Sequence, residues 1–214
     1  MISKKKTLTI LLSILLTSSI LLIVFAYNNV SLLFIIANGC YQPSNIYYFT
    51  TERIFENLDS NDCTNLTNRL SKSEYEYLYD IYIHVLGVAG CADSKKYFID
   101  LYLKCREDPN MKSTCIKIVN AMGYSNSKEY VPFLESLLEQ DSKSNLPSQY
   151  YVSRALYLIT GNLYPYYDNG EKPNKLVITE KLKRARSLLS ENDKGQRTAQ
   201  KMVAIDKLFR PPGW

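Results

Sequence analysis

An internal repeat in the middle of the chain constrains the fold more than any other feature of the sequence. Between residues 74 and 161, two stretches carry similar residues in the same order, 33 positions apart. The matched pairs are Ile83 and Ile116, Val85 and Ile118, Leu86 and Val119, Gly90 and Gly123, Ser94 and Ser127, Lys95 and Lys128, Tyr97 and Tyr130, and Leu101 and Leu134. A third apolar segment ends at Gly161, 38 positions after Gly123. A period of this length is typical of arrays of helical hairpins.

The order of residues within each unit predicts a hairpin of two helices. An apolar helix stops at a glycine, a Ser, Asp or Asn caps the next start, and a second helix follows. One such hairpin cannot bury its apolar stripe alone, so neighbouring hairpins stack and share a core. The sequence therefore predicts an all-α fold, an α-solenoid in which Ile83 and Ile116, like Leu101 and Leu134, are equally buried.

The turn and second helix of the second unit resemble HEAT repeats, particularly the short bacterial HEAT-like form. The likeness is carried by Val119-Asn120-Ala121-Met122-Gly123 and by the segment from Ser127 to Leu134, SKEYVPFL. The first unit departs from the pattern, because Ile99 stands where the second has Pro132. The resemblance implies a scaffold or protein-binding role. Some relatives act with chromophore-attaching lyases, but nothing in this chain points to a tetrapyrrole site.

The N-terminus carries the strongest single signal for location. Thr7 to Ala26 is a run of 20 residues without a charge, preceded by Lys4, Lys5 and Lys6. At about 1.5 Å per residue such a helix is about 30 Å long, the thickness of a bilayer's hydrocarbon core. The lysines keep the N-terminus in the cytoplasm by the positive-inside rule. We therefore expect a single-pass membrane protein, held through residues 7–26, with its C-terminal domain on the non-cytoplasmic, periplasmic side.

A secretory signal peptide is the alternative interpretation of the same run. Val24 and Ala26 are small enough for the −3 and −1 positions of a cleavage site, which would leave a secreted or periplasmic protein. The run is longer than the 7 to 15 residues of most signal cores, and this favours a retained anchor. Both alternatives export the rest of the chain.

The remaining sequence divides the chain into four parts. These are the anchor or signal peptide at 1–26, N-terminal helices and a linker at 27–73, the repeats at 74–161, and a tyrosine-rich loop with basic capping helices at 162–214. Outside the repeats, helices are expected at Val30–Ala37, Ile46–Leu58, Lys175–Ser190 and Gly195–Phe209. The polar residues 59–73 are expected to supply loop and capping chemistry.

The cysteines bear on compartment more than on catalysis. All five follow the anchor, in a space where disulfides persist: Cys40, Cys63, Cys91, Cys105 and Cys115. Cys91 and Cys105 bracket one expected helix and would lie about 21 Å apart, far beyond the roughly 7 Å limit for a bond. Cys105 and Cys115 flank a turn at nearly equal distances, so we expect them to be joined, with Cys40 to Cys63 as a second bond and Cys91 free. Five reduced thiols are the alternative.

The sequence contains few residues suited to catalysis. His84 is the only histidine, which excludes a multi-histidine zinc site and leaves one base for a hydrolase. The chain has no glycine-rich phosphate loop, no GxSxG and no HExxH. We expect His84 on a helix surface or hydrogen-bonded in the core, and we predict no enzymatic activity, cofactor or metal.

Two tracts near the C-terminus are candidates for contact with another protein. One is the tyrosine-rich loop with Tyr164, Tyr166 and Tyr167, and the other is the basic segment with Arg184 and Arg186. The tyrosines could instead cover the last hairpin, and the charges could form a solvated helix face. No nucleic-acid motif accompanies the charges, so no nucleic acid is expected. The sequence thus predicts a non-enzymatic interaction module or scaffold, with an envelope immunity protein or an auxiliary enzyme subunit as alternatives.

Overall fold

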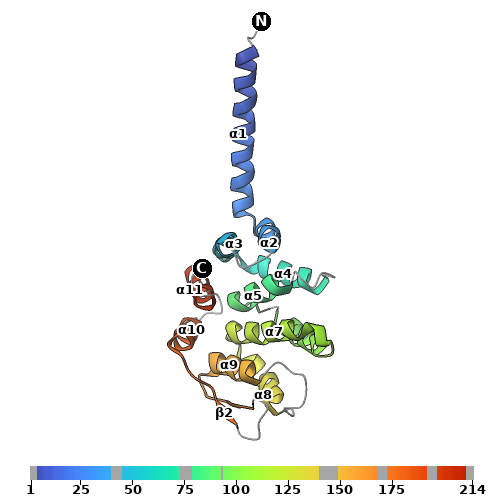
Figure 1. The fold of residues 1–214 in the computed structure, drawn as a ribbon, viewed down its shortest axis with the longest axis vertical. Helices are drawn as coiled ribbons and strands as arrows, with labels where there is room; N and C mark the ends of the chain where they lie inside the picture. Colours follow the sequence, from blue (N-terminus) through green and yellow to red (C-terminus); the bar gives the residue numbers. More distant parts are fainter. Residues whose placement is uncertain are drawn as a thin grey trace. The chain divides into compact units, whose positions relative to one another are not determined.

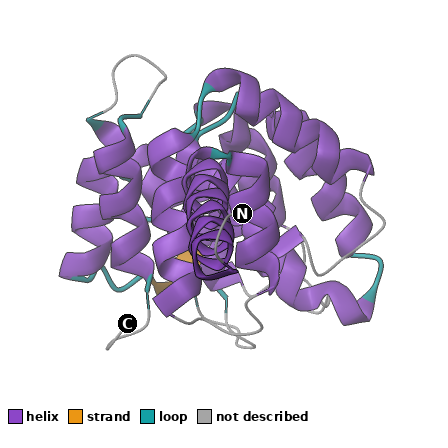
Figure 2. Cartoon of the chain, turned by 90° about the horizontal axis from the view of Figure 1, so that it is seen from above, coloured by secondary structure: helices purple, strands orange, loops and turns teal. Residues whose placement is uncertain are grey.

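A computed structural model of the chain describes residues 4–39, 45–72, 79–92, 94–139, 149–167, 173–191 and 197–210. These residues form helices almost throughout, which confirms the predicted all-α class (Figures 1 and 2). The chain divides into two compact units, residues 1–57 and residues 58–214. The helices are α1 (Lys4–Asn28), α2 (Val30–Gly39), α3 (Asn45–Asn57), α4 (Ser60–Lys72), α5 (Tyr79–Ala89), α6 (Ser94–Cys105), α7 (Lys112–Ser125), α8 (Val131–Glu139), α9 (Gln149–Thr160), α10 (Glu180–Ser190) and α11 (Ala199–Phe209).

The first unit is a long helix followed by a helical hairpin. α2 begins after Asn29, whose side-chain oxygen accepts from the Leu32 N–H at 3.1 Å and so caps the helix. α2 and α3 pack against each other. Their contact buries apolar side chains from both helices: Val30, Leu33, Phe34, Ala37, Ile54 and Phe55.

Along the described residues, no single helix is both long enough and apolar enough to cross a membrane alone. The segments Leu12–Phe25 and Val30–Ala37 reach the required length and apolarity only together, and they are bent by 92° to each other.

The second unit is built on three helices that stack in chain order. α7 lies between α5 and α9 and packs against both (Figure 1). A glycine permits each close approach, because a Cβ on Gly87 would lie 2.6 Å from the Ala121 Cα and one on Gly123 would lie 2.9 Å from the Ala155 Cα. α6 packs against α7, and α8 against α9. The core is therefore continuous along the stack.

The spacing between the ends of the stacked helices differs from the 33 and 38 residues predicted. α5, α7 and α9 are each followed by a residue with positive φ: Gly90 at 68°, Asn126 at 54° and Gly161 at 81°. The intervals between these caps are 36 and 35 residues, because Asn126, not Gly123, follows the end of α7. The predicted register is therefore wrong. Asparagine enters the left-handed region readily, so it can replace glycine at a helix end.

Burial also repeats at 36 residues. Ile83 is fully buried, but its predicted equivalent Ile116 is only half-buried, and Val119 is the residue that matches it. Leu101 and Leu134 are both buried as predicted. The 36-residue register pairs Leu101 with Leu137 instead, at 5% and 2% exposure.

Two segments outside the repeat differ from expectation. The polar residues 59–73 contain helix α4, because the side chains of Asp59 and Asp62 each accept from the other's backbone N–H and cap its start, while Leu66 and Leu70 are buried. The helix expected from Lys175 begins only at Glu180. Upstream of it, β2 (Asn174–Lys175) pairs antiparallel with β1 (Pro165–Tyr166).

Two disulfides link described segments of the second unit. The predicted bond between Cys105 and Cys115 is present, across a short 3₁₀ helix at Pro109–Met111. The second bond joins Cys63 to Cys91, so the expectation of a Cys40–Cys63 bond with Cys91 free is wrong. The reason is that α4 packs against α5, which brings the first turn of α4 to the residue after Gly90. Cys40 lies outside the described residues. Two disulfides favour an oxidising, non-cytoplasmic compartment.

Candidate functional site

The two C-terminal helices lie along the side of the stack. α10 packs against α9, and α11 packs against α5 (Figure 1). α10 begins where the Thr179 hydroxyl accepts from the Leu182 N–H, and α11 begins where the Thr198 hydroxyl accepts from the Lys201 N–H. This arrangement brings residues of the chain's end beside residues of all three stacked helices.

The segment that carries α10 and α11, which we call the C-terminal segment, contacts the three positive-φ caps in the reverse of their order along the chain. The guanidinium of Arg186 lies against Gly161, where a Cβ would be 2.6 Å from its Nε. The side-chain amide of Asn126 donates to the Leu189 carbonyl at 3.0 Å. The guanidinium of Arg197 lies over Gly90, 3.3 Å from where a Cβ would be.

Arg197 caps the C-terminal end of α5. Its Nη1 donates to the Val88 carbonyl and, at 3.5 Å, to the Gly87 carbonyl. Burial lowers the pKa of Arg197 to about 10, since only 8% of the residue is exposed. The negative end of the helix dipole and the Val88 carbonyl in the last turn of α5 offset that cost.

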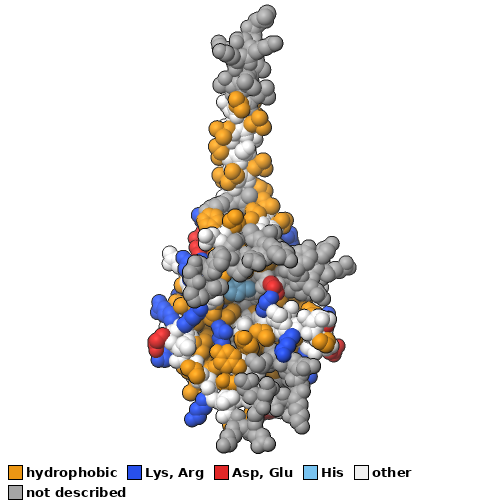
Figure 3. All heavy atoms as spheres, viewed as in Figure 1, with side chains coloured by type: hydrophobic (Ala, Val, Ile, Leu, Met, Phe, Trp, Pro, Cys, Tyr) orange, Lys and Arg blue, Asp and Glu red, His pale blue; other side chains and the backbone are white. Residues whose placement is uncertain are grey.

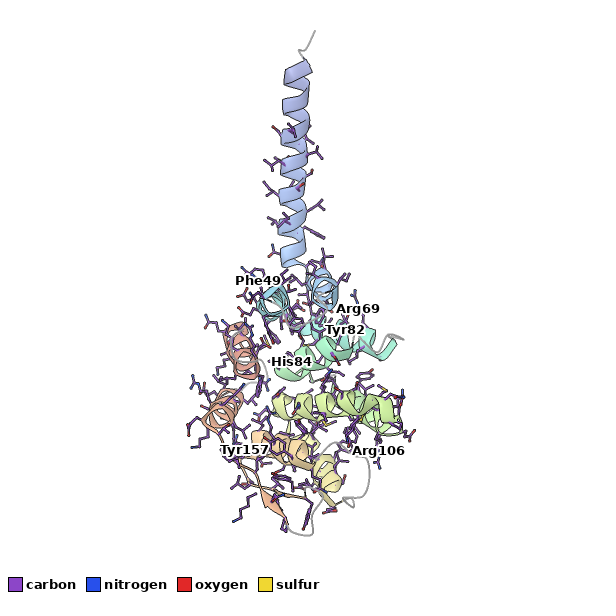
Figure 4. All side chains as sticks on the ribbon, in the orientation of Figure 1. Phe49, Arg69, Tyr82, His84, Arg106 and Tyr157 are labelled. Atoms are coloured by element: carbon purple, nitrogen blue, oxygen red, sulfur yellow. A yellow bond between two sulfur atoms is a disulfide. The ribbon has the colours of Figure 1, made fainter. Side chains whose placement is uncertain are left out.

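His84, labelled in Figure 4, lies on α5 and contacts a buried carboxylate of α11. The His84 Nε2 lies 2.8 Å from one oxygen of Asp206, and Arg210 donates to the other oxygen from Nη2 at 2.8 Å and Nε at 3.1 Å. Burial raises the pKa of Asp206, but the hydrogen bonds and charges of His84 and Arg210 outweigh it and hold the pKa below its ordinary value. The expected hydrogen-bonded histidine is therefore observed, and its partner is Asp206.

Next to this ion pair lies a group of aromatic and cationic side chains, Tyr124, Arg154, Lys181 and Phe209, which we call the Phe209 cluster. The Tyr124 and Phe209 rings are 4.3 Å apart. The Arg154 Cζ lies 5.2 Å and the Lys181 Nζ 5.8 Å from the Phe209 centroid, and Arg154 also donates to the Tyr124 hydroxyl at 3.2 Å. Four helices, α7, α9, α10 and α11, contribute one residue each.

The Phe209 cluster holds two positive charges close together. Burial lowers the pKa of Lys181, and the charge of Arg154 lowers it further. Within the described residues, neither cation forms an ion pair. Lys181 is exposed and Arg154 and Phe209 are half-buried, so a ligand can reach them. A carboxylate is the group best suited to this arrangement, because it neutralises both cations while the ring holds them by cation–π attraction.

The predicted contact residues do not form one site. Tyr164 donates to Glu135 at 2.9 Å, and the Tyr166 ring lies edge-on to Tyr150 at 5.5 Å, so both contact the last hairpin. The backbone of Tyr167 donates to Gln149 at the start of α9, whereas Arg186 contacts Gly161 after its end. A helix of 12 residues is about 18 Å long, which separates the two groups. Arg184 is exposed on α10.

A cavity of about 540 Å³ lies elsewhere in the second unit, at the start of α4. It is lined by residues at and just before the start of α4, in the turn after α5 and at the start of α11, among them Asp59, Ser60, Cys63, Gly90, Cys91 and Arg197. The Cys63–Cys91 disulfide therefore faces a space that solvent can enter. Among the residues described here, no three His, Cys, Asp or Glu side chains are grouped so as to hold a metal ion.

Sequence reasoning missed the Phe209 cluster. Its members are separated by up to 85 positions, from Tyr124 to Phe209, and no short motif links them. The available signal was the single phenylalanine at the end of a basic helical segment. Blue Lys and Arg side chains gather over α10 and α11 in Figure 3, beside orange hydrophobic ones. No protein family, no curated protein and no solved structure matches the chain, so its function must be inferred from its own residues.

Proposed function

We propose that this chain is a non-enzymatic protein-binding module, and that its second unit binds an acidic segment of a partner protein at the Phe209 cluster. The observation that carries the proposal is the pair of cations, Arg154 and Lys181, held over one aromatic ring, with no carboxylate of the described residues paired to either. A partner's Asp or Glu would relieve their repulsion. Arginine and aromatic residues are also enriched among the residues that dominate protein interfaces.

The framework that presents this surface is, on this proposal, a short α-solenoid of the HEAT-like type. The succession of α5, α7 and α9, with caps 36 and 35 residues apart, supports it, as does the resemblance of residues 119–134 to that family. Such arrays offer extended surfaces for protein partners.

The proposed location is the non-cytoplasmic side of a membrane, with the protein held there by the apolar helix α1. The charge-free run from Thr7 to Ala26 after three lysines supports the orientation. The two disulfides support an oxidising compartment. A partner in the envelope, such as a toxin or an enzyme that the module assists, is consistent with this location.

Carbodiimide cross-linking in the intact envelope tests the proposal, because this reagent joins a lysine amine directly to a carboxylate. Mass spectrometry should recover a peptide in which Lys181 is bonded to an Asp or Glu of another polypeptide. The identity of that polypeptide then distinguishes a toxin from an enzyme. Lys181→Arg should lose the cross-link but still co-purify with the partner, since the charge remains.

Lys181→Glu should lose both the cross-link and the co-purification. Lys128→Glu is the matched control, because Lys128 is also exposed but lies on a 3₁₀ helix away from the cluster. Partner recovery that is equal for wild type and Lys181→Glu, or reduced as much by Lys128→Glu, contradicts binding at the Phe209 cluster.

A further inference from the structure

The absence of charge continues well past the apolar run of α1. The chain has no Asp, Glu, Lys, Arg or His from Thr7 to Thr51, whereas a helix of about 20 residues is enough to cross a bilayer. The additional residues include all of α2 and the first half of α3. A membrane crossing alone therefore does not explain why these additional residues lack charge.

The hairpin of α2 and α3 leaves large apolar side chains on its surface. On α2, Ile35 is 64% and Ile36 39% exposed, although the helix buries other apolar residues against α3. On α3, Ile46 is 62% and Phe49 51% exposed. Figure 3 shows hydrophobic side chains at the foot of α1 as well as along it.

The exposed face of α3 is apolar at the start of the helix and charged at its end. Ile46, Phe49, Arg53 and Glu56 follow one another at helical spacing, so they share a face. This face begins with two apolar side chains and ends with an ion pair between Arg53 and Glu56, in which the Arg53 guanidinium lies 5.9 Å from the Phe49 ring centroid. Only the first half of α3 therefore offers an apolar surface to lipid, and Arg53 lies at the edge of that surface.

The direction of α2 fits a location in the membrane surface. Its axis is bent by 92° from α1, and Figure 1 shows α1 from the side but α2 and α3 nearly end-on. If α1 is parallel to the membrane normal, α2 lies in the membrane plane. Tyr47, in the first turns of α3, is of the residue type that is enriched at this depth.

We propose that the α2–α3 hairpin is a membrane-interface platform, with Ile35, Ile36, Ile46 and Phe49 inserted among the lipid headgroups and upper acyl chains on the non-cytoplasmic side. The inference rests on the membrane anchoring proposed above. It adds that the chain binds the lipid surface a second time, immediately after the anchor, so that the first unit contacts lipid through two elements rather than one.

Tryptophan fluorescence in reconstituted vesicles tests the platform. The full chain, with its only tryptophan replaced in Trp214→Phe, receives one new tryptophan as Phe49→Trp, Leu16→Trp or Glu56→Trp. Vesicles of phosphatidylcholine carry bromine atoms either near the headgroup or deep in the acyl chains, and bromine quenches only nearby indoles. Phe49→Trp should be blue-shifted and strongly quenched by shallow bromine. Leu16→Trp should be quenched by deep bromine, and Glu56→Trp should be quenched by neither.

The outcomes separate the two proposals. If Leu16→Trp is quenched but Phe49→Trp is not, the anchor is retained and the platform is refuted. If Phe49→Trp is blue-shifted without quenching, protein covers the hairpin instead of lipid, which also refutes it. If Leu16→Trp is not quenched, the proposal that α1 anchors the chain in the membrane is refuted. Strong quenching of Glu56→Trp would contradict the boundary assigned to Arg53.

Discussion

The two disulfides should respond differently to a reducing agent, because they differ in exposure and in the length of chain they close. Cys63 is half-buried and Cys63–Cys91 faces the 540 Å³ cavity, whereas Cys105 and Cys115 are 0% and 2% exposed. Exchange requires that a thiolate reach a sulfur atom. A limiting amount of a dithiol should therefore reduce Cys63–Cys91 first.

The loss of each bond has a calculable cost. The Cys63–Cys91 bond closes a loop of 28 residues and the Cys105–Cys115 bond a loop of 10. In the chain-entropy model these loops contribute about 3.6 and about 2.7 kcal/mol to the free energy of unfolding at 25 °C. Opening the first bond should thus remove about 1 kcal/mol more than opening the second, although it is the easier one to open.

Peptide mapping and urea denaturation together check this reasoning. Trypsin places Cys63 in peptide 54–69 and Cys91 in peptide 73–95, so alkylation after partial reduction should label these peptides before 113–117, which holds Cys115. The Cys63→Ala/Cys91→Ala variant should lose about 3.6 kcal/mol in urea unfolding. Earlier labelling of Cys115, or a bond between Cys63 and Cys40 in the unreduced protein, would refute the pairing and the exposure argument.

Three other predictions concern the second unit and can be measured by urea unfolding. Asp206→Asn should cost about 3 kcal/mol at pH 7, because it removes a carboxylate from a buried ion pair. The difference in stability from wild type should shrink as the pH falls below about 4. The pKa of Asp206 is lower in the folded than in the unfolded protein, so its carboxylate stabilises the fold above the unfolded pKa, and this stabilisation is lost as the pH falls through the folded pKa. Gly87→Ala should be destabilising, because about 1 to 3 kcal/mol of overpacking against the Ala121 backbone exceeds the gain of about 1 kcal/mol in helix propensity. Leu134→Ala should cost about 2 to 5 kcal/mol and Lys128→Ala less than about 0.5 kcal/mol; equal stability of these two variants would contradict the buried role of Leu134.

Local patterns in the sequence were enough to predict the helical class and one disulfide. The apolar periodicity between Glu74 and Gly161 indicated helices, and the ten-residue spacing of Cys105 and Cys115 brought the two sulfurs together across a turn. Both inferences use contacts between residues close in the chain. Helix formation and a short turn depend mainly on neighbouring residues, so the sequence reveals them directly.

The register of the repeat and the Phe209 cluster depend on features that a local pattern does not reveal. A glycine inside a helix, such as Gly123, looks like a helix stop unless the close approach of a second helix at Ala155 is known. Asn126 looks like an ordinary polar residue until its positive φ is known. The Phe209 cluster requires the position of α11 beside the stack, and that position is decided by packing over long separations rather than by any spacing.

The C-terminal segment couples the stability of the three stacked helices, α5, α7 and α9. In an ordinary helical-repeat array each repeat contacts only its neighbours, so stability is close to a sum of local terms and the ends can open separately. Here one segment contacts the end of each stacked helix: Arg186 at Gly161, Leu189 at Asn126, and Arg197 at Gly90. Opening any one of the three stacked helices therefore breaks contacts with the segment that holds the other two. The same segment carries Lys181 and, through α11, Phe209, so a partner bound at the Phe209 cluster would stabilise the three stacked helices together rather than the last one alone.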